Sequence, residues 1–177
     1  WVKLAGMGNW YDYFIADFSG GWTSQLSLGI MGNPSNFQFF AYEGKSASDN
    51  TYVYSSSGKK TDVWYHVGVV RDDGTKTMKI YINGVPEGIS SYAYKTIVPL
   101  QRSKYLGWSG TTFNDHFNGV LDEVEIYNRA LSDSEIQAIF EAGSAGKCKY
   151  LTIDIDIKPG SSINNINPGS KGKIPVA

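Results

Sequence analysis

The chain has 177 residues, and its 16 basic and 17 acidic side chains give a formal net charge of −1. Neither sign of charge forms a long run, which excludes the basic stripe of a nucleic-acid-binding protein. No apolar stretch approaches the roughly 20 residues of a membrane-spanning helix, so we expect no membrane insertion. One cysteine, Cys148, excludes an internal disulfide framework.

The first third of the chain alternates between apolar and polar residues with a period of two, as half-buried strands do. The stretches 10–17, 25–30 and 37–41 show this alternation, and glycine-containing turns separate them. In the last stretch Phe37 and Phe39 share a face with Ala41. Twenty glycines and twelve tyrosines, with only 19% charged residues, also favour strands and turns over helices.

The middle of the chain predicts two successive β-hairpins. Residues 63–71 are apolar on both faces, which is typical of a central strand, and Asp72-Asp73-Gly74 predicts a turn after them. Residues 78–82 then alternate, and Asn83-Gly84 predicts a second tight turn. His66 lies within the first strand beside Trp64, a position more typical of a hydrogen-bonded core residue than of a catalytic base. Many short strands at this spacing predict a sandwich or a barrel.

One helix is predicted near residues 132–142. Ser132 and Glu135 form the pattern of a capping box, and Leu131 and Ile136 form a hydrophobic staple around it. Gly143 predicts the end of the helix.

The remaining residues predict a change of domain. Small residues at 144–147 suggest a linker, and four apolar residues then alternate between 151 and 157. We therefore divide the chain into a domain of residues 1–145 and a segment of residues 146–177, which comprises a linker and the start of a following module too poor in apolar residues to fold alone. Trp1 falls inside a predicted strand, and the pattern of residues 174–177 is also cut off at Ala177. We therefore expect the sequence to be a piece of a longer protein.

Three runs of residues resemble a known family. Trp64-Tyr65-His66-Val67, Lys79-Ile80-Tyr81-Ile82-Asn83-Gly84 and Phe117-Asn118-Gly119-Val120-Leu121-Asp122 occur in the order found in laminin-G-like jelly-roll domains of the concanavalin A-like lectin/glucanase superfamily. The resemblance covers about residues 1–145, although such domains normally have a strand or two before the position of Trp1.

The resemblance implies an all-β fold, a sandwich of two antiparallel sheets. It also implies an extracellular or cell-surface location and binding of carbohydrate or protein, often with calcium. Residues 153–160 and 172–177 are similar to a segment that follows repeated modules in large microbial surface proteins. Other modules of the same polypeptide are therefore expected partners.

Asp122 is the candidate metal ligand. If residues 117–127 form one strand, Asp122 shares an inward face with Val120 and Val124, where a carboxylate is costly unless it is paired or bound to metal. The resemblance implies a structural calcium ion held by Asp122, with Asp17 as a possible second ligand. Alternatively, Asp122 accepts hydrogen bonds from backbone N–H groups or from Arg129.

Glu123 and Glu125 superficially suggest a glycosidase. Retaining glycosidases need two carboxyl groups about 5–5.5 Å apart, which residues two apart on a strand can provide. The order of the acidic residues does not match that of the related glycosidases, so an ordinary solvated strand face is favoured and we expect no enzyme.

Aromatic residues in predicted loops are candidate sugar platforms, because an apolar ring face stacks on sugar C–H groups. The candidate ligand-binding residues are Trp22, Tyr92, Trp108, Asn114 and Asp115, the last two in the loop that contains His116. Each aromatic ring could instead be a packing residue.

Three functions remain open at this point. The first is a non-catalytic carbohydrate-binding or adhesion module, with a carbohydrate or a cell-surface glycoprotein as partner. The alternatives are a structural repeat of a cell-surface or S-layer-like assembly, and a glycosidase or lyase domain.

Overall fold

A computed structural model describes residues 1–7, 11–16, 24–44, 50–92, 105–108 and 116–143. The chain divides into two units, Trp1–Gly143 and Ser144–Ala177, and the second lies outside the described residues. The interpretation of residues 146–177 as a linker and a following module therefore stays a prediction.

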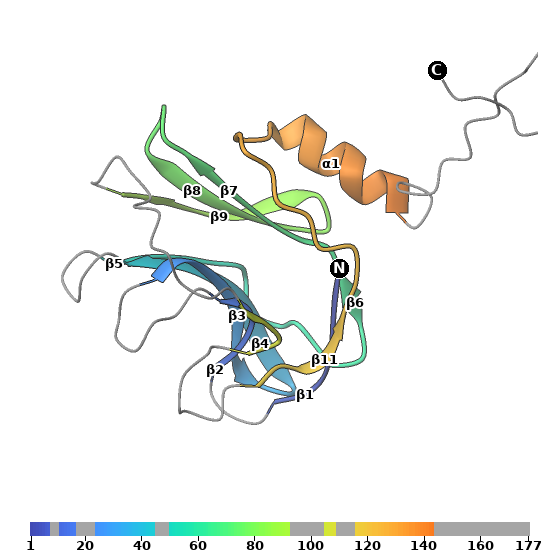
Figure 1. Ribbon diagram of the computed structural model, residues 1–177. Coiled ribbons are helices and arrows are strands. Elements are labelled where there is room, and N and C mark those ends of the chain that lie inside the picture. The colour runs from blue at the N-terminus through green and yellow to red at the C-terminus, as the bar shows by residue number, and fades with distance from the viewer. Residues whose placement is uncertain (8–10, 17–23, 45–49, 93–104, 109–115, 144–177) are drawn as a thin grey trace, which may run out of the picture. The chain divides into compact units, whose positions relative to one another are not determined.

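The described residues form two layers of antiparallel strands, as predicted for a β-sandwich. One layer is a five-stranded sheet in the order β10-β2-β3-β4-β5. The three-stranded sheet β7-β8-β9 lies opposite it as the second layer, and a further three-stranded sheet, β11-β1-β6, lies at one side of these layers (Figure 1). The elements are β1 (Val2–Gly6), β2 (Tyr11–Ala16), β3 (Ser24–Asn33), β4 (Asn36–Gly44), β5 (Asn50–Tyr54), β6 (Trp64–Tyr65), β7 (Val67–Asp72), β8 (Thr77–Ile82), β9 (Val85–Ser91), β10 (Tyr105–Leu106), β11 (Asn118–Leu121) and α1 (Asp133–Ala142).

The two predicted hairpin turns are confirmed. Asn83 and Gly84 both have positive φ, 51° and 80°, between β8 and β9, which is the requirement of a type I′ turn. Between β7 and β8, the Asp72 carboxylate accepts the Gly74 N–H at 2.8 Å. The predicted long strand 63–71 is interrupted at His66, which is buried and separates β6 from β7. There the His66 N–H donates to the Asn83 side chain at 3.0 Å.

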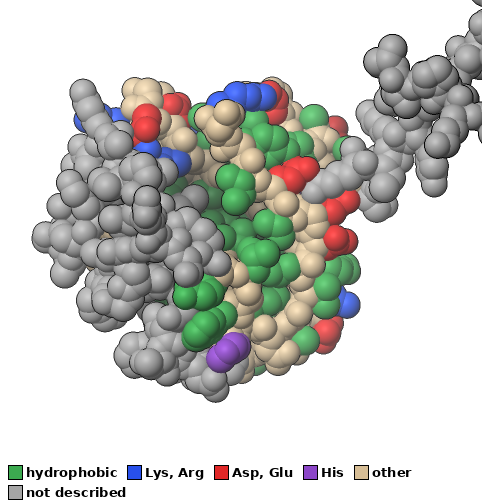
Figure 2. All heavy atoms as spheres, viewed as in Figure 1, with side chains coloured by type: hydrophobic (Ala, Val, Ile, Leu, Met, Phe, Trp, Pro, Cys, Tyr) green, Lys and Arg blue, Asp and Glu red, His purple; other side chains and the backbone are tan. Residues whose placement is uncertain are grey.

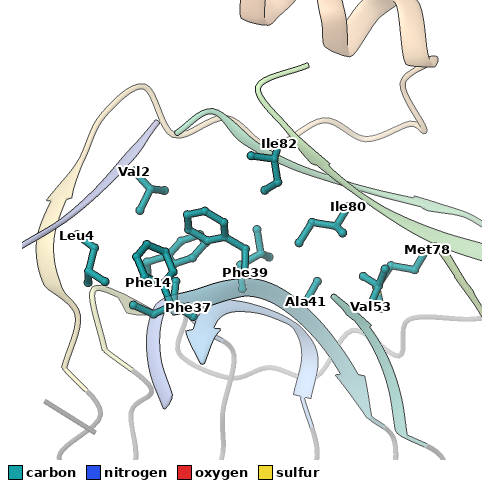
Figure 3. Close-up of a cluster of buried hydrophobic side chains, with 12 residues drawn as sticks. Val2, Leu4, Phe14, Phe37, Phe39, Ala41, Val53, Met78, Ile80 and Ile82 are labelled. Atoms are coloured by element: carbon teal, nitrogen blue, oxygen red, sulfur yellow. The ribbon is translucent and has the colours of Figure 1, made fainter. Parts of the chain in front are cut away.

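The core lies between the two layers (Figure 3). Phe37, Phe39 and Ala41 of β4 enter it, as their alternation predicts, and Phe39 meets Phe37 edge-to-face with ring centroids 5.6 Å apart. The buried cluster comprises Val2, Leu4, Phe14, Leu28, Ile30, Phe37, Phe39, Ala41, Val53, Met78, Ile80 and Ile82.

The predicted helix is confirmed, with Ser132 as its N-cap. The Ser132 hydroxyl accepts the Glu135 N–H at 3.3 Å, and the Glu135 carboxylate accepts the Ser132 N–H at 2.9 Å, which is the reciprocal pair of a capping box. Leu131 and Ile136 pack together with Val70 of β7 and Tyr81 of β8. Helix α1 thus covers the side of β7–β9 that faces away from the five-stranded sheet (Figure 1).

A buried ion pair joins the two layers at one end of the core. The Arg71 Nε–H of β7 donates to the Glu43 carboxylate of β4 at 2.7 Å, and the two side chains are only 7% and 3% exposed. Burial raises the pKa of the Glu43 carboxyl, although the Arg71 guanidinium opposes this. Asp73 and the ring of Tyr92 also contact the Arg71 guanidinium, so the buried cation is partnered on several sides.

Candidate functional site

The strand register places aromatic side chains in line across the outer face of the five-stranded sheet. Tyr13 lies opposite Gly29, Gly29 opposite Phe40, and Phe40 opposite Tyr54. Residues directly opposite one another in an antiparallel ladder share a face. Because Phe39, next to Phe40, enters the core, this line lies on the side away from the core.

The rings along this line are in contact. Tyr13 meets Phe40 edge-to-face at a centroid distance of 5.5 Å, and Phe40 lies 6.4 Å from Tyr54. Tyr54 stacks on Tyr52 at 5.8 Å with an interplanar angle of 2°, and Tyr52 lies 4.7 Å from Tyr42. We call Tyr13, Phe40, Tyr42, Tyr52 and Tyr54 the aromatic row.

Exposure differs along the aromatic row. Phe40 and Tyr42 are buried, whereas Tyr13 and Tyr52 are half-buried and Tyr54 is 40% exposed. The Tyr42 hydroxyl donates to the Asn50 side chain at 3.1 Å, which fixes that ring. The row therefore presents Tyr54 next to the half-buried Tyr52, while the buried Phe40 separates Tyr54 from the half-buried Tyr13.

Gly29 allows the rings to meet. A Cβ at this position would lie 2.9 Å from atoms of the Phe40 ring and 2.6 Å from the Asp12 carbonyl oxygen. The lack of a side chain at Gly29 leaves room for Tyr13 and Phe40 to touch across β3, as aromatic rings cover glycine in other sheets.

A second aromatic group adjoins the row at β10. The Trp108 ring stacks on His116 at 5.5 Å with an interplanar angle of 5°, and Tyr105 meets Trp108 edge-to-face at 5.1 Å. Isolated bridges link His116 to Tyr13 and to Trp108. Trp108 is half-buried, and its buried Nε1–H has no hydrogen-bond partner among the described residues. The predicted binding residue Trp108 thus lies at the edge of the sheet that carries the row.

The structure contradicts the prediction that Tyr92 is a sugar platform. Its side chain is only 4% exposed, and its hydroxyl donates to the Asp72 carbonyl oxygen at 2.9 Å and to the Asp73 carboxylate at 2.6 Å. Burial and the hydrogen bond to Asp73 raise the pKa of the Tyr92 hydroxyl. Its ring packs against the Arg71 guanidinium at 4.1 Å, so Tyr92 is a packing residue and not an exposed sugar platform. The candidates Trp22, Asn114 and Asp115 lie outside the described residues.

The predicted burial of Asp122 is wrong. Strand β11 ends at Leu121, which packs against the core and lies opposite the buried Val2. Val120 and Asp122 are exposed, because the strand register differs by one residue from the predicted one. The Asp122 carboxylate accepts the neighbouring Glu123 N–H at 2.8 Å, and the predicted partner Arg129 instead pairs with Glu135.

The described residues do not assemble a calcium site. Calcium takes six to eight oxygen ligands, and no group of three or more His, Cys, Asp or Glu side chains suited to a metal occurs in the described part of the chain. Asp17, the second proposed ligand, lies outside that part. Calcium therefore stays a prediction.

The acidic residues suggested as a glycosidase pair do not lie on a strand, whereas another acidic residue is buried in the sheet. Glu123 and Glu125 lie after β11 and not on a continuing strand, and the Tyr127 hydroxyl donates to Glu125. Asp12, by contrast, is fully buried opposite Ile30. Its position two residues before the buried Phe14 was the available signal.

Residues 1–137 match the family model described as the concanavalin A-like lectin/glucanases superfamily. The chain belongs to this superfamily. This confirms the resemblance on which the expected jelly-roll sandwich was based.

Two solved structures share the fold. A candidate carbohydrate-binding protein from Bacteroides ovatus is 18% identical with a TM-score of 0.61, over 77% of this chain and 38% of that protein. A heptameric SAP-like pentraxin from Limulus polyphemus is 15% identical with a TM-score of 0.60, over 82% of this chain and 69% of the pentraxin. Among the described residues, no helix is both long and apolar enough to cross a membrane.

Proposed function

We propose that this chain is a non-catalytic extracellular module that binds carbohydrate on the aromatic row. The observation that carries the proposal is the continuous contact of five rings on the outer face of one sheet, with Tyr54 exposed. Aromatic faces bind the C–H faces of sugars, and the half-buried ring of Tyr52 beside Tyr54 would hold a neighbouring sugar unit. Membership of a superfamily that contains lectins supports the same conclusion.

The chemistry of the row favours an uncharged sugar chain. Its five side chains are phenyl or phenol rings, which offer apolar faces and hydroxyls but no ionised group at neutral pH. We therefore expect neutral polysaccharides or the neutral arms of cell-surface glycoproteins to be the ligands.

The absence of catalysis is part of the proposal. Glu123 and Glu125 follow β11 of the sheet β11-β1-β6 and do not lie on the sheet that carries the aromatic row. These two carboxylates therefore supply no acid–base pair to a sugar on the row, as a glycosidase mechanism would require.

Calorimetric titration with a panel of soluble neutral polysaccharides tests the proposal. The Tyr54→Ala variant should lose at least about fivefold in affinity, since one stacked ring contributes roughly 1 kcal/mol or more. Trp64→Ala is the matched control, because Trp64 is also 40% exposed but lies on β6, outside the sheet that carries the aromatic row, and the variant should bind as the wild type does. Equal losses in both variants, or no binding to any polysaccharide, would contradict the proposal.

Chelation tests the calcium prediction in the same titration. If calcium holds the binding surface, EDTA should weaken binding and lower the melting temperature of the wild type, and added calcium should restore both. If EDTA changed neither binding nor the melting temperature, the calcium prediction would be wrong. The proposal that the aromatic row binds carbohydrate would still stand.

A further inference from the structure

Exposed apolar side chains gather in and after β11. Val120, Val124 and Tyr127 are all exposed, and Ile126 is 89% exposed. Figure 2 shows hydrophobic and acidic side chains next to one another at the surface of the molecule. Single exposed apolar residues are ordinary, but several within eight residues mark an interaction surface.

This stretch has the pattern of a strand but forms none beyond Leu121. Apolar Val124 and Ile126 alternate with Glu125 and Tyr127, yet residues 122–130 belong to no strand in the described part of the chain. Strand β11 is at the edge of the sheet β11-β1-β6, and an exposed segment that follows an edge strand and has alternating side chains can pair with another chain.

We propose that residues 124–128 pair antiparallel with the same residues of a second copy of this chain, about a two-fold axis at Ile126. The two Ile126 side chains then lie opposite each other, and each covers the other. Glu125 lies opposite Tyr127 of the second copy, and this pair already forms a hydrogen bond within one chain. A two-fold axis makes each favourable pair occur twice.

The charges at the ends of the segment fit the same register. Glu123 falls opposite Arg129 of the second copy, and Arg129 falls opposite Glu123 of the second copy. Glu123 has a positive φ of 49°, so regular pairing starts at Val124 and the charged pair closes each end through long side chains. Arg129 already pairs with Glu135 at 2.6 Å, and Glu123 would extend this exposed ion pair into a network.

Other registers are less favourable. An axis at Glu125 places that carboxylate opposite itself, and an axis at Val124 places Glu123 opposite Glu125, so both oppose like charges. An axis at Tyr127 places Tyr127 opposite itself and Glu125 opposite Arg129, but it leaves Ile126, the most exposed apolar side chain of the segment, opposite the amide of Asn128. The formal net charge of −1 opposes association only weakly.

Sedimentation velocity over a wide range of protein concentrations tests the dimer. The wild type should pass from monomer to dimer, and Ile126→Arg should raise the dissociation constant at least about tenfold, because two like charges would meet on the axis. Ile89→Arg is the matched control, since Ile89 is 62% exposed on β9 and should leave the dimer intact. A wild type that stays monomeric, or a dimer that Ile126→Arg does not weaken, would overturn the proposal.

Cysteine cross-linking tests the register, in a Cys148→Ser background that removes the natural thiol. Ile126→Cys should form a disulfide-linked dimer on mild oxidation, because directly opposite residues come close enough for a disulfide. Val124→Cys should cross-link far less, because Asn128 of the second copy lies opposite it. Equal cross-linking of the two variants would rule out the axis at Ile126.

Discussion

The outer faces of the two layers are both apolar, but only one of them is covered by the helical segment. On β7 and β8, Val70 and Tyr81 are covered by Leu131 and Ile136 of the helical segment. On the five-stranded sheet, the outer face carries the aromatic row and leaves Tyr54 exposed. Burial of apolar area is what stabilises a fold, so the helix-covered face should contribute mainly to stability and the row mainly to binding.

The largest expected effect is on the helix-covered face. Ile136→Ala should lower the free energy of unfolding by about 2–4 kcal/mol, because it removes buried methyl groups and leaves a cavity between α1 and β7. Urea unfolding measures this change. Ile89→Ala, at an exposed position of β9, should change stability by less than about 0.5 kcal/mol. Similar values for the two variants would mean that α1 does not cover the sheet as described.

Two glycines compare the faces more directly. Gly29→Ala should cost about 1–3 kcal/mol, because its Cβ would lie 2.9 Å from the Phe40 ring and 2.6 Å from the Asp12 carbonyl oxygen. Gly68→Ala on β7 should be nearly neutral, within about 0.5 kcal/mol, because the nearest atoms, those of Ile136 and Tyr81, lie 3.7 Å away. Urea unfolding of the two variants measures these changes. A larger loss of stability in Gly68→Ala than in Gly29→Ala would contradict the described packing of the two faces.

The helix cap comes next in size. Ser132→Ala should cost about 1 kcal/mol, because the Glu135 N–H loses its acceptor at the first turn of α1. Thermal unfolding followed by circular dichroism measures the loss. The neighbouring Ser134→Ala should have a smaller effect, under about 0.5 kcal/mol, because Ser134 is not the N-cap. A reversed order would place the cap at a different residue.

The smallest expected effect is a pH dependence. The Arg129 guanidinium, together with hydrogen bonds from Ser132, lowers the pKa of the Glu135 carboxyl from 4.5 to about 2. A depressed pKa adds stability that is present above the ordinary value and is lost as the pH falls from 4.5 towards 2. Glu135→Gln should therefore flatten the acid slope of urea unfolding. Ser134→Ala, which removes no carboxyl group from the first turn of α1, should keep the slope of the wild type.

Local signals in the sequence were enough for the hairpins and the helix. The Asn83-Gly84 turn and the capping box at Ser132 depend on residues within a few positions of each other, so the sequence contains the whole signal. The interruption at His66 was not predictable, because it depends on hydrogen bonds to Asn83 across the hairpin.

The register of β11 was not predictable for a specific physical reason. The inward face carries Leu121 but has Gly119 in the middle, so it looks less apolar in the sequence than the outward face with Val120. The Phe117 ring occupies the space over Gly119, where a Cβ would lie 2.6 Å from it. The face that looked like the core in the sequence is therefore the exposed one.

The aromatic row could be predicted only in part. Phe40 and Tyr42 alternate with Phe39 and Ala41, which shows that β4 is apolar on both faces. The contacts with Tyr13 and Tyr54 depend on the pairing of β2, β3, β4 and β5, which links residues far apart in the chain. Tyr92 was misassigned because the sequence does not show that Arg71 and Asp73 enclose it.

The Glu43–Arg71 pair has a consequence for how this sequence can change over time. Loss of either residue alone would leave a charge stranded inside the sandwich, which costs several kcal/mol, whereas exchange of both for apolar residues of similar size is often harmless. Any lineage that replaces the pair one residue at a time must therefore pass through a poorly folding intermediate. The two positions should be inherited together or lost together.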